Sequence, residues 1–220
     1  MEANFWHERW AKREIGFHLD DVNPFLIKHW PAAQAGSSDT VFVPLCGKTK
    51  DLIWLADQVK SVIGIELSQT AIEEFFHDNE LVPNITEIED FTVYQCENIT
   101  LLCGDFFNLT QQILADCQFV YDRASLVALP PEMRKAYVKK LHEIMSDEAS
   151  RLLITFEYPQ HEMAGPPHSV SASEVQILLS DQFNIECLES KNIIANAQRF
   201  KDKGVTKLFE HVFLLKQKLS

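Results

Sequence analysis

Glycine is scarce in this chain, and several ligand-binding signatures are absent with it. Among 220 residues there are only 7 glycines, and no segment has the three closely spaced glycines of a dinucleotide-binding turn. The early glycine of a phosphate-binding loop ending in Gly47-Lys48-Thr49 would stand at Phe42. The sequence therefore contains no cradle for a pyrophosphate or a triphosphate.

Metal-binding and disulfide patterns are also missing. The 5 cysteines form no C-x-x-C pair, and the 8 histidines show no H-E-x-x-H spacing. Several cysteines lie in apolar runs, as buried thiols do. We therefore expect no bound metal, no disulfide framework and a reducing, cytoplasmic location.

Positive charge and long apolar runs are both in short supply. The chain has 20 Lys and Arg against 32 Asp and Glu, a formal net charge of −12. Nucleic acid and anionic membranes attract concentrated positive charge, so neither is an expected partner. No apolar run approaches the length of a membrane span, and the first residues do not form a signal peptide. No apolar seam indicates a second subunit, which favours a monomer.

The length and the hydrophobic content of 46% favour one α/β domain over residues 1–220. Residues 1–39 form an N-terminal helical extension, in which Trp6 and Trp10 share one face of a predicted helix. Together with Phe17, these rings form either an aromatic stripe packed on a sheet or a lid over a flat heterocycle.

The remaining segment, residues 40–220, opens with a predicted strand, turn and helix. Residues 40–45 are apolar and β-branched, and the run breaks at Cys46-Gly47. The next buried run ends on Glu66, 19 residues after Gly47. In the first βαβ unit of nucleoside-binding sheets, the turn lets the backbone approach the ligand and the acid accepts hydrogen bonds from the ribose. A plain turn with a chance acid explains this stretch alone equally well.

Two later predicted strands also end in polar residues, at the edge where open α/β sheets bind ligands. After the strand at 98–103, Asp105 and Phe106 offer a polar partner and an apolar wall for an adenine ring, or Asp105 caps the next helix. After the strand at 117–121, Arg123 is either a ligand contact or part of a weak salt bridge with the preceding acid.

Seven strands are expected, five of them alternating with helices. The last two, residues 183–189 and 207–216, should pair antiparallel because no helix-length pattern separates them. The acidic span 78–90 is interpreted as a surface insertion that can form a hairpin. A seven-stranded, doubly wound, Rossmann-like sheet with an antiparallel last strand points to a methyltransferase that binds S-adenosylmethionine, a nucleoside with a cationic tail in place of a phosphate.

Beyond this architecture, the chain resembles the thiopurine S-methyltransferase family in its bacterial form, over nearly the whole sequence. The most specific likeness is the Pro-Leu-Cys-Gly-Lys turn, which stands where other nucleoside-binding sheets have a Gly-rich loop. The segments that carry the resemblance are residues 5–10, 43–51, 64–66, 104–107, 121–130 and 165–167.

The resemblance implies a set of site residues. On the donor side, together with Gly47 of the turn, these are Trp10, Leu45, Glu66, Asp105, Phe106 and Arg123. Glu66 would take the ribose hydroxyls, and Asp105 with Phe106 would hold the adenine. Arg123 and Arg199 would face the acceptor, and we place Phe17 and Pro166 on the acceptor side as well.

The implied activity is transfer of a methyl group from the co-substrate S-adenosylmethionine to the sulfur of a small aromatic or heterocyclic thiol such as a thiopurine. The thiolate would displace the donor sulfur in line, with Arg123 as the catalytic residue. Alternatives are a methyltransferase acting mainly on selenium or tellurium metabolites, and a non-catalytic nucleoside-binding domain. A nicotinamide-dependent reductase is disfavoured by the lone glycine of the first turn.

Overall fold

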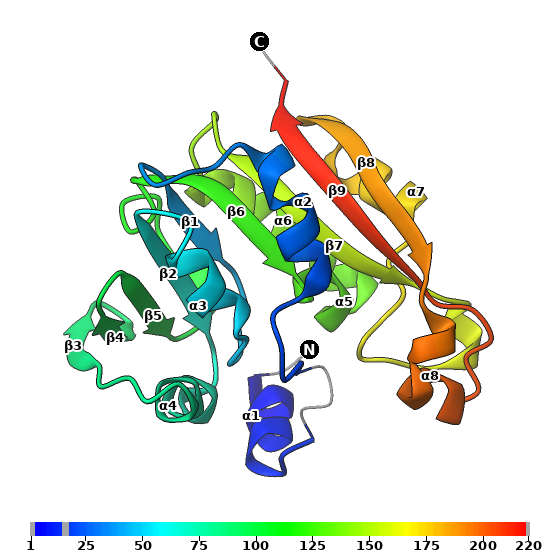
Figure 1. Ribbon diagram of the computed structural model, residues 1–220, viewed down its shortest axis with the longest axis horizontal. Coiled ribbons are helices and arrows are strands. Elements are labelled where there is room, and N and C mark those ends of the chain that lie inside the picture. The colour runs from blue at the N-terminus through cyan, green and yellow to red at the C-terminus, as the bar shows by residue number, and fades with distance from the viewer. Residues whose placement is uncertain (1–2, 15–17, 219–220) are drawn as a thin grey trace.

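The strands of the chain join in one mixed sheet, seen in a computed structural model that describes residues 3–14 and 18–218. The strands are β1 (Thr40–Val43), β2 (Ser61–Glu66), β3 (Asn84–Ile88), β4 (Phe91–Cys96), β5 (Ile99–Cys103), β6 (Cys117–Arg123), β7 (Ser150–Glu157), β8 (Phe183–Asn192) and β9 (Phe209–Gln217). Their order across the sheet is β3-β4-β5-β2-β1-β6-β7-β9-β8 (Figure 1). The run from β5 to β7 is parallel, and the strands outside it pair antiparallel.

Helices connect these strands. They are α1 (Ala3–Ala11), α2 (Pro24–Ala33), α3 (Asp51–Ala56), α4 (Gln69–Asp78), α5 (Ser125–Ala128), α6 (Pro131–Ile144), α7 (Ala172–Leu179) and α8 (Gln198–Asp202), with short 3₁₀ turns η1 (Phe106–Asn108), η2 (Gln160–Glu162) and η3 (Ile194–Asn196). Side-chain caps fix three of the α-helix starts. Asn23 accepts from Phe25 N at 2.8 Å, Ser68 from Ala71 N at 3.4 Å and Ser171 from Glu174 N at 3.1 Å.

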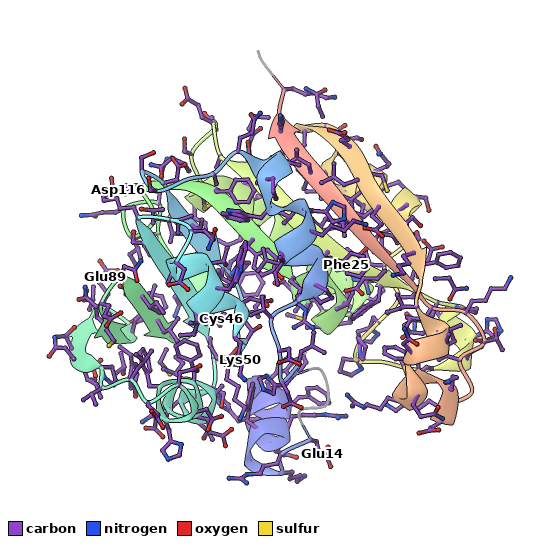
Figure 2. All side chains as sticks on the ribbon, in the orientation of Figure 1. Glu14, Phe25, Cys46, Lys50, Glu89 and Asp116 are labelled. Atoms are coloured by element: carbon purple, nitrogen blue, oxygen red, sulfur yellow. The ribbon has the colours of Figure 1, made fainter. Side chains whose placement is uncertain are left out.

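Successive apolar side chains along a strand point to opposite faces, so each face of the sheet carries a hydrophobic core. In β1, Val41 and Val43 pack in one cluster with α2, α3 and α4, whereas Phe42 packs in the other with α6 and α7. Side chains fill the centre of the molecule around Cys46, and Glu14 and Glu89 lie on its periphery (Figure 2). An α/β sheet with a parallel centre and an antiparallel last strand, as expected from the sequence, is confirmed.

The expected strand number is wrong, since the described chain forms nine strands and not seven. The two extra strands, β3 and β4, make an antiparallel hairpin beside β5, within and after the acidic insertion. Every residue of β3 is exposed at the sheet edge. An exposed edge strand needs no apolar alternation, so its pattern is weak in the sequence. The antiparallel pairing of the last two strands is confirmed.

The two N-terminal helices occupy different positions. In α2, Trp30 is buried and packs edge-to-face on Trp54 and Phe119, so this helix belongs to the core. It also continues through Pro31 to Ala33. In contrast, α1 lies beside α4, away from the sheet centre (Figure 1). No helix in residues 3–14 and 18–218 is long and apolar enough to cross a membrane.

The close packing of β2 at Gly64 is testable. A Cβ added there would lie 2.6 Å from Leu101 Cδ2 and 2.9 Å from Cys46 Sγ, so Gly64→Ala should lower the free energy of unfolding by about 1–3 kcal/mol in urea denaturation. The matched control is Gly36→Ala, where nothing lies within 4 Å of the added Cβ. Equal stability of the two variants would contradict this packing.

Candidate functional site

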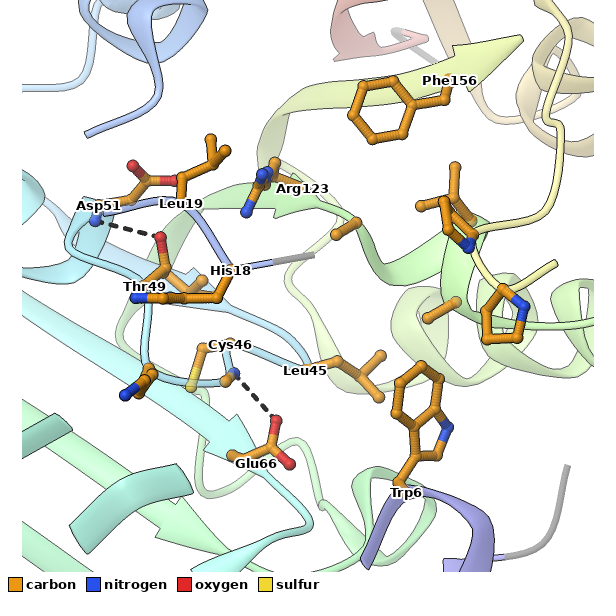
Figure 3. Close-up of a pocket in the computed structure, with 18 of the residues that line it drawn as sticks. Trp6, His18, Leu19, Leu45, Cys46, Thr49, Asp51, Glu66, Arg123 and Phe156 are labelled. Atoms are coloured by element: carbon orange, nitrogen blue, oxygen red, sulfur yellow. Dashed lines mark hydrogen bonds between the residues drawn. The ribbon is translucent and has the colours of Figure 1, made fainter. Parts of the chain in front are cut away.

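A pocket opens at the carboxyl ends of β1, β2 and β6, where open α/β sheets bind ligands. Glu66 and Trp6 lie toward one end of it, and Arg123 and Phe156 toward the other (Figure 3). The α1 helix, the turn after β1, the segment after Pro159 and α8 all contribute to its lining. The site therefore combines parts of the chain that are far apart in sequence.

Glu66 is buried at the end of β2, and its carboxylate is held by backbone donors. One oxygen accepts from Gly47 N at 2.9 Å and the other from Ser68 N at 2.8 Å. Burial raises the pKa of Glu66, and hydrogen bonds from the Ser68, Gly47 and Leu67 backbone act against that rise. A carboxylate has about four acceptor positions, so at least one is left for a ligand hydroxyl.

The turn after β1 is shaped by two left-handed residues. Leu45 has φ 47° and Gly47 has φ 55°, and both line the pocket. A side chain at Gly47 would meet Trp10, whose ring carbon lies 3.3 Å from the position of the missing Cβ. Non-glycine residues in this backbone region are uncommon and often mark functional sites. The lone glycine of the turn therefore lets the α1 indole approach the backbone closely.

Cys46 lies in the same turn and lines the pocket. Burial raises the pKa of the Cys46 thiol well above its ordinary value, and the nearby Glu66 carboxylate adds to the rise. Only a thiolate reacts readily. The raised pKa therefore favours the neutral, unreactive form of the Cys46 thiol.

Lys48 connects the turn after β1 to α4 through ion pairs. Its ammonium lies 2.7 Å from a Glu74 oxygen and 2.9 Å from an Asp78 oxygen. A guanidinium nitrogen of Arg13, just after α1, lies 3.9 Å from the other oxygen of Glu74. This set of charges links the N-terminal segment, the turn and α4 around one edge of the site.

A polar group of buried residues lies beside Arg123. Asp51 accepts from Asn23 N at 2.7 Å and from the Tyr121 hydroxyl at 2.8 Å, and both Asp51 and Tyr121 line the pocket. Glu210 on β9 is also buried. Burial raises the pKa of Glu210 to about 7, while the Arg123 charge and a hydrogen bond with Asn23 act in the opposite direction. This group connects α2 to the floor of the pocket.

Most of the predicted site residues meet in this one pocket. Those that line it are Trp10, Leu45, Gly47, Glu66, Arg123, Pro166 and Arg199. Phe17 lies outside the described residues.

Asp105 and Phe106 are not part of the pocket lining. Asp105 is exposed and caps η1 by accepting from Phe107 N at 2.9 Å, the alternative that the sequence left open. Phe106 is buried in the core with its ring 4.9 Å from that of Tyr137. Both follow β5, whose register places Cys103 opposite Glu66. Their proposed contact with an adenine stays a prediction.

Several lining residues were missed from the sequence, among them His18, Met163, Phe200 and Lys203. They lie in connecting segments, which carry no periodic signal. Burial lowers the pKa of His18, and the Lys48 charge lowers it further. Within residues 3–14 and 18–218, no cluster of three His, Cys, Asp or Glu side chains could hold a metal ion.

Solved structures with a similar fold include S-adenosylmethionine-dependent methyltransferases. A methyltransferase of this class from Anabaena variabilis superposes with a TM-score of 0.66 at 14% identity, covering 98% of this chain and 95% of that chain. A Burkholderia thailandensis 1,6-didemethyltoxoflavin-N1-methyltransferase, solved with S-adenosylhomocysteine, gives a TM-score of 0.65 at 12% identity, covering 99% and 87%.

Sequence comparison narrows this class to one family. The family described as Thiopurine S-methyltransferase (TPMT) matches residues 1–218. A thiopurine S-methyltransferase of Pseudomonas fluorescens (strain SBW25) is 45% identical over 215 residues, 98% of this chain and 99% of that protein. One from Nitrosospira multiformis is 46% identical over 215 residues, 98% of each. The chain belongs to the thiopurine S-methyltransferase family.

The buried Glu210 predicts a pH-dependent stability. Because its folded-state pKa of about 7 exceeds the ordinary 4.5, the folded protein holds a proton that the unfolded chain releases first. Stability should therefore fall as pH rises from about 4.5 to 7, by on the order of 3 kcal/mol from this group. Glu210→Gln should remove that fall, as measured by urea denaturation at pH 5 and pH 8.

The control for this comparison is Glu186→Gln, which changes an exposed carboxylate on β8. It should keep the wild-type dependence on pH. If Glu210→Gln and wild type lose equal stability between the two pH values, the Glu210 carboxyl does not titrate in this range.

Proposed function

We propose that this protein transfers a methyl group from S-adenosylmethionine to the sulfur of an aromatic or heterocyclic thiol such as a thiopurine. The observation that carries the proposal is the buried Glu66 carboxylate, held by backbone donors with acceptor capacity left over, in a pocket without a Gly-rich phosphate loop. A nucleoside whose tail is not a phosphate fits that arrangement. The family membership supports the same donor and acceptor.

The residues present fit the donor. Glu66 would accept hydrogen bonds from the ribose hydroxyls, and Leu45, Gly47 and Trp10 would line the site around it. Asp105 and Phe106 would contact the adenine at the end of β5, where Gly104 N donates to Glu66 O at 3.0 Å. When bound, S-adenosylmethionine supplies a methyl carbon attached to a positively charged sulfur.

The acceptor end is apolar and cationic. Phe156, Pro166 and Phe200 line it and would exclude water from a flat ring, while Arg123 lies among them. Arg199 lies on the same side, and Phe17 would add a further ring. Aromatic walls with one charged group are suited to an aromatic thiolate.

Alignment provides most of the catalysis in this mechanism. An aromatic thiol is more acidic than an ordinary thiol with a pKa of about 8.5, so it needs little help to ionise. Arg123 would stabilise the thiolate and hold it in line with the methyl carbon. Orientation of this kind contributes roughly 7–11 kcal/mol to lowering a barrier. No covalent intermediate with the protein is required.

The proposal extends to the sheet arrangement, the domain organisation, the oligomeric state and the location of the protein. Core clusters on both faces of the sheet support a doubly wound arrangement, and residues 1–220 would act as one domain. Within the extension of residues 1–39, α1 would cover the pocket, whereas α2 is fixed in the core. A net charge of −12 and five free cysteines support a cytoplasmic monomer without nucleic acid or membrane partners and without a bound metal.

The proposal is tested by transfer of a labelled methyl group from S-adenosylmethionine to thiophenol and to 6-mercaptopurine. Glu66→Gln should weaken S-adenosylhomocysteine binding roughly tenfold to a hundredfold in calorimetry, because hydrogen bonds to a charged acceptor are lost. Glu73→Gln, at an exposed position of α4, is the control. Donor binding without transfer to any thiol would indicate a binding domain, and transfer only to selenium or tellurium compounds would indicate that alternative.

Arg123 should matter more for the acceptor than for the donor. Arg123→Ala is expected to lower kcat/KM for a thiophenol by roughly a hundredfold, as loss of a charge-stabilising group does, while the Kd of S-adenosylhomocysteine changes less than about threefold. The control is Arg13→Ala, at an exposed position outside the pocket. Equal losses in both measurements would assign Arg123 to the donor instead.

A further inference from the structure

The turn after β1 is held from both sides by the strands that flank it. Toward β2, the backbone N–H groups of Cys46 and Gly47 each donate a hydrogen bond at 2.9 Å. Toward β6, the Ser125 hydroxyl donates to the Pro44 carbonyl at 3.2 Å. Proline has no N–H for the strand ladder, so this side-chain bond links the ends of β1 and β6 beyond their paired residues.

The Ser125 hydroxyl joins two turns that both contain a left-handed residue other than glycine. Leu45, next to Pro44, has φ 47°, and Ala124, next to Ser125, has φ 69°. Both residues line the pocket. Such backbone conformations are unfavourable and persist only where the surrounding contacts fix them. The hydrogen bond therefore connects the two turns at residues adjacent to their strained positions.

The β6 end of this link is anchored by buried side chains from α6 and β7. The Tyr137 hydroxyl donates to an Asp122 oxygen at 2.8 Å, and an Arg151 nitrogen lies 3.9 Å from the same oxygen. Burial raises the pKa of Asp122, while the Arg151 charge and hydrogen bonds with Tyr137 and Ser125 act against the rise. Ser125 itself is completely buried. The end of β6 is thus a fixed point to which the turn after β1 is attached.

We propose that Ser125 is a positioning residue for methyl transfer. Its hydroxyl sets the turn after β1, which carries the donor side of the pocket, at a fixed position relative to the end of β6, which carries Arg123. Ser125 does not line the pocket, so it acts through the two turns and not by touching either substrate. The inference rests on the proposed methyl transfer and adds a residue to it.

The expected consequence is a loss of rate without a matching loss of affinity. In a direct displacement, alignment of the methyl carbon with the thiolate supplies much of the acceleration, and it is sensitive to small displacements. Each reactant is bound mainly by groups on one side of the link. Loosening the link should therefore disturb the relative position of the two reactants more than the binding of either one.

Two variants of Ser125 and one control separate this role from a general loss of stability. Ser125→Ala removes the donor, and Ser125→Cys keeps a side chain of similar size with only a weak donor. The control is Ser61→Ala, which removes a hydroxyl that lies 2.8 Å from Thr40 Oγ1 at the amino ends of β1 and β2. Ser61 is not in the pocket lining.

The rate is measured as single-turnover transfer of a labelled methyl group from S-adenosylmethionine to thiophenol, with both at saturation. Both Ser125 variants should be roughly tenfold slower than wild type. The Kd of S-adenosylhomocysteine, measured by calorimetry, should change less than about threefold. Ser61→Ala should lower the midpoint of urea denaturation, because it also loses a hydrogen bond, and should keep the wild-type rate.

Several results would overturn the proposal. A wild-type rate in Ser125→Ala or in Ser125→Cys would show that the hydroxyl is not needed for alignment. Slower transfer in Ser61→Ala as well would trace the effect to stability, and a loss of S-adenosylhomocysteine affinity equal to the loss of rate would assign Ser125 to donor binding alone. Failure of wild type to methylate thiophenol would contradict the proposed function itself, which distinguishes that failure from a failure of this inference.

Discussion

The site depends on the hydrogen bond from Gly47 N to the Glu66 carboxylate at 2.9 Å, which joins the ends of β1 and β2. A buried carboxylate is costly unless its oxygens are paired, so the turn and the acid stabilise each other. Cys46 N also donates to Ile65 O at 2.9 Å, which extends the pairing of the two strands into the turn. The left-handed conformations of Leu45 and Gly47 follow from these contacts, and they bring the backbone against the α1 indole.

Side-chain packing places the other lining residues of the pocket around the Gly47 turn and Glu66. Trp10 comes from the N-terminal helix, and Phe200 comes from the connection between the last two strands. Each is placed by its own contacts, Trp10 against Gly47 and Phe200 against Phe156 and Tyr158. The sheet edge supplies the floor of the pocket, and the two outer segments supply part of its walls.

The sequence predicts the central strands well because buried parallel strands read as continuous apolar runs. It also brings Gly47 and Glu66 together correctly, since their spacing belongs to one βαβ unit. It offers a hairpin at β3 and β4 only as an option, because the residues of β3 are all exposed and need no apolar pattern. Lys203 escapes prediction because the docking of Phe200 decides where α8 lies, and that contact spans distant parts of the chain.

The distribution of charge along the pocket agrees with the chemistry of methyl transfer. The reaction consumes a positive donor and a negative thiolate, so charge is lost as the transition state forms. Groups that paired tightly with either reacting centre would stabilise the ground state more than the transition state. Glu66 lies at the opposite end from Arg123, where it can bind the ribose without facing the thiolate. The Arg123 charge also acts against the rise in the pKa of the buried Glu210 carboxyl. In the proposed function, Glu66 would thus bind the donor at a distance from the reacting atoms, while Arg123 would orient the thiolate at the other end of the pocket.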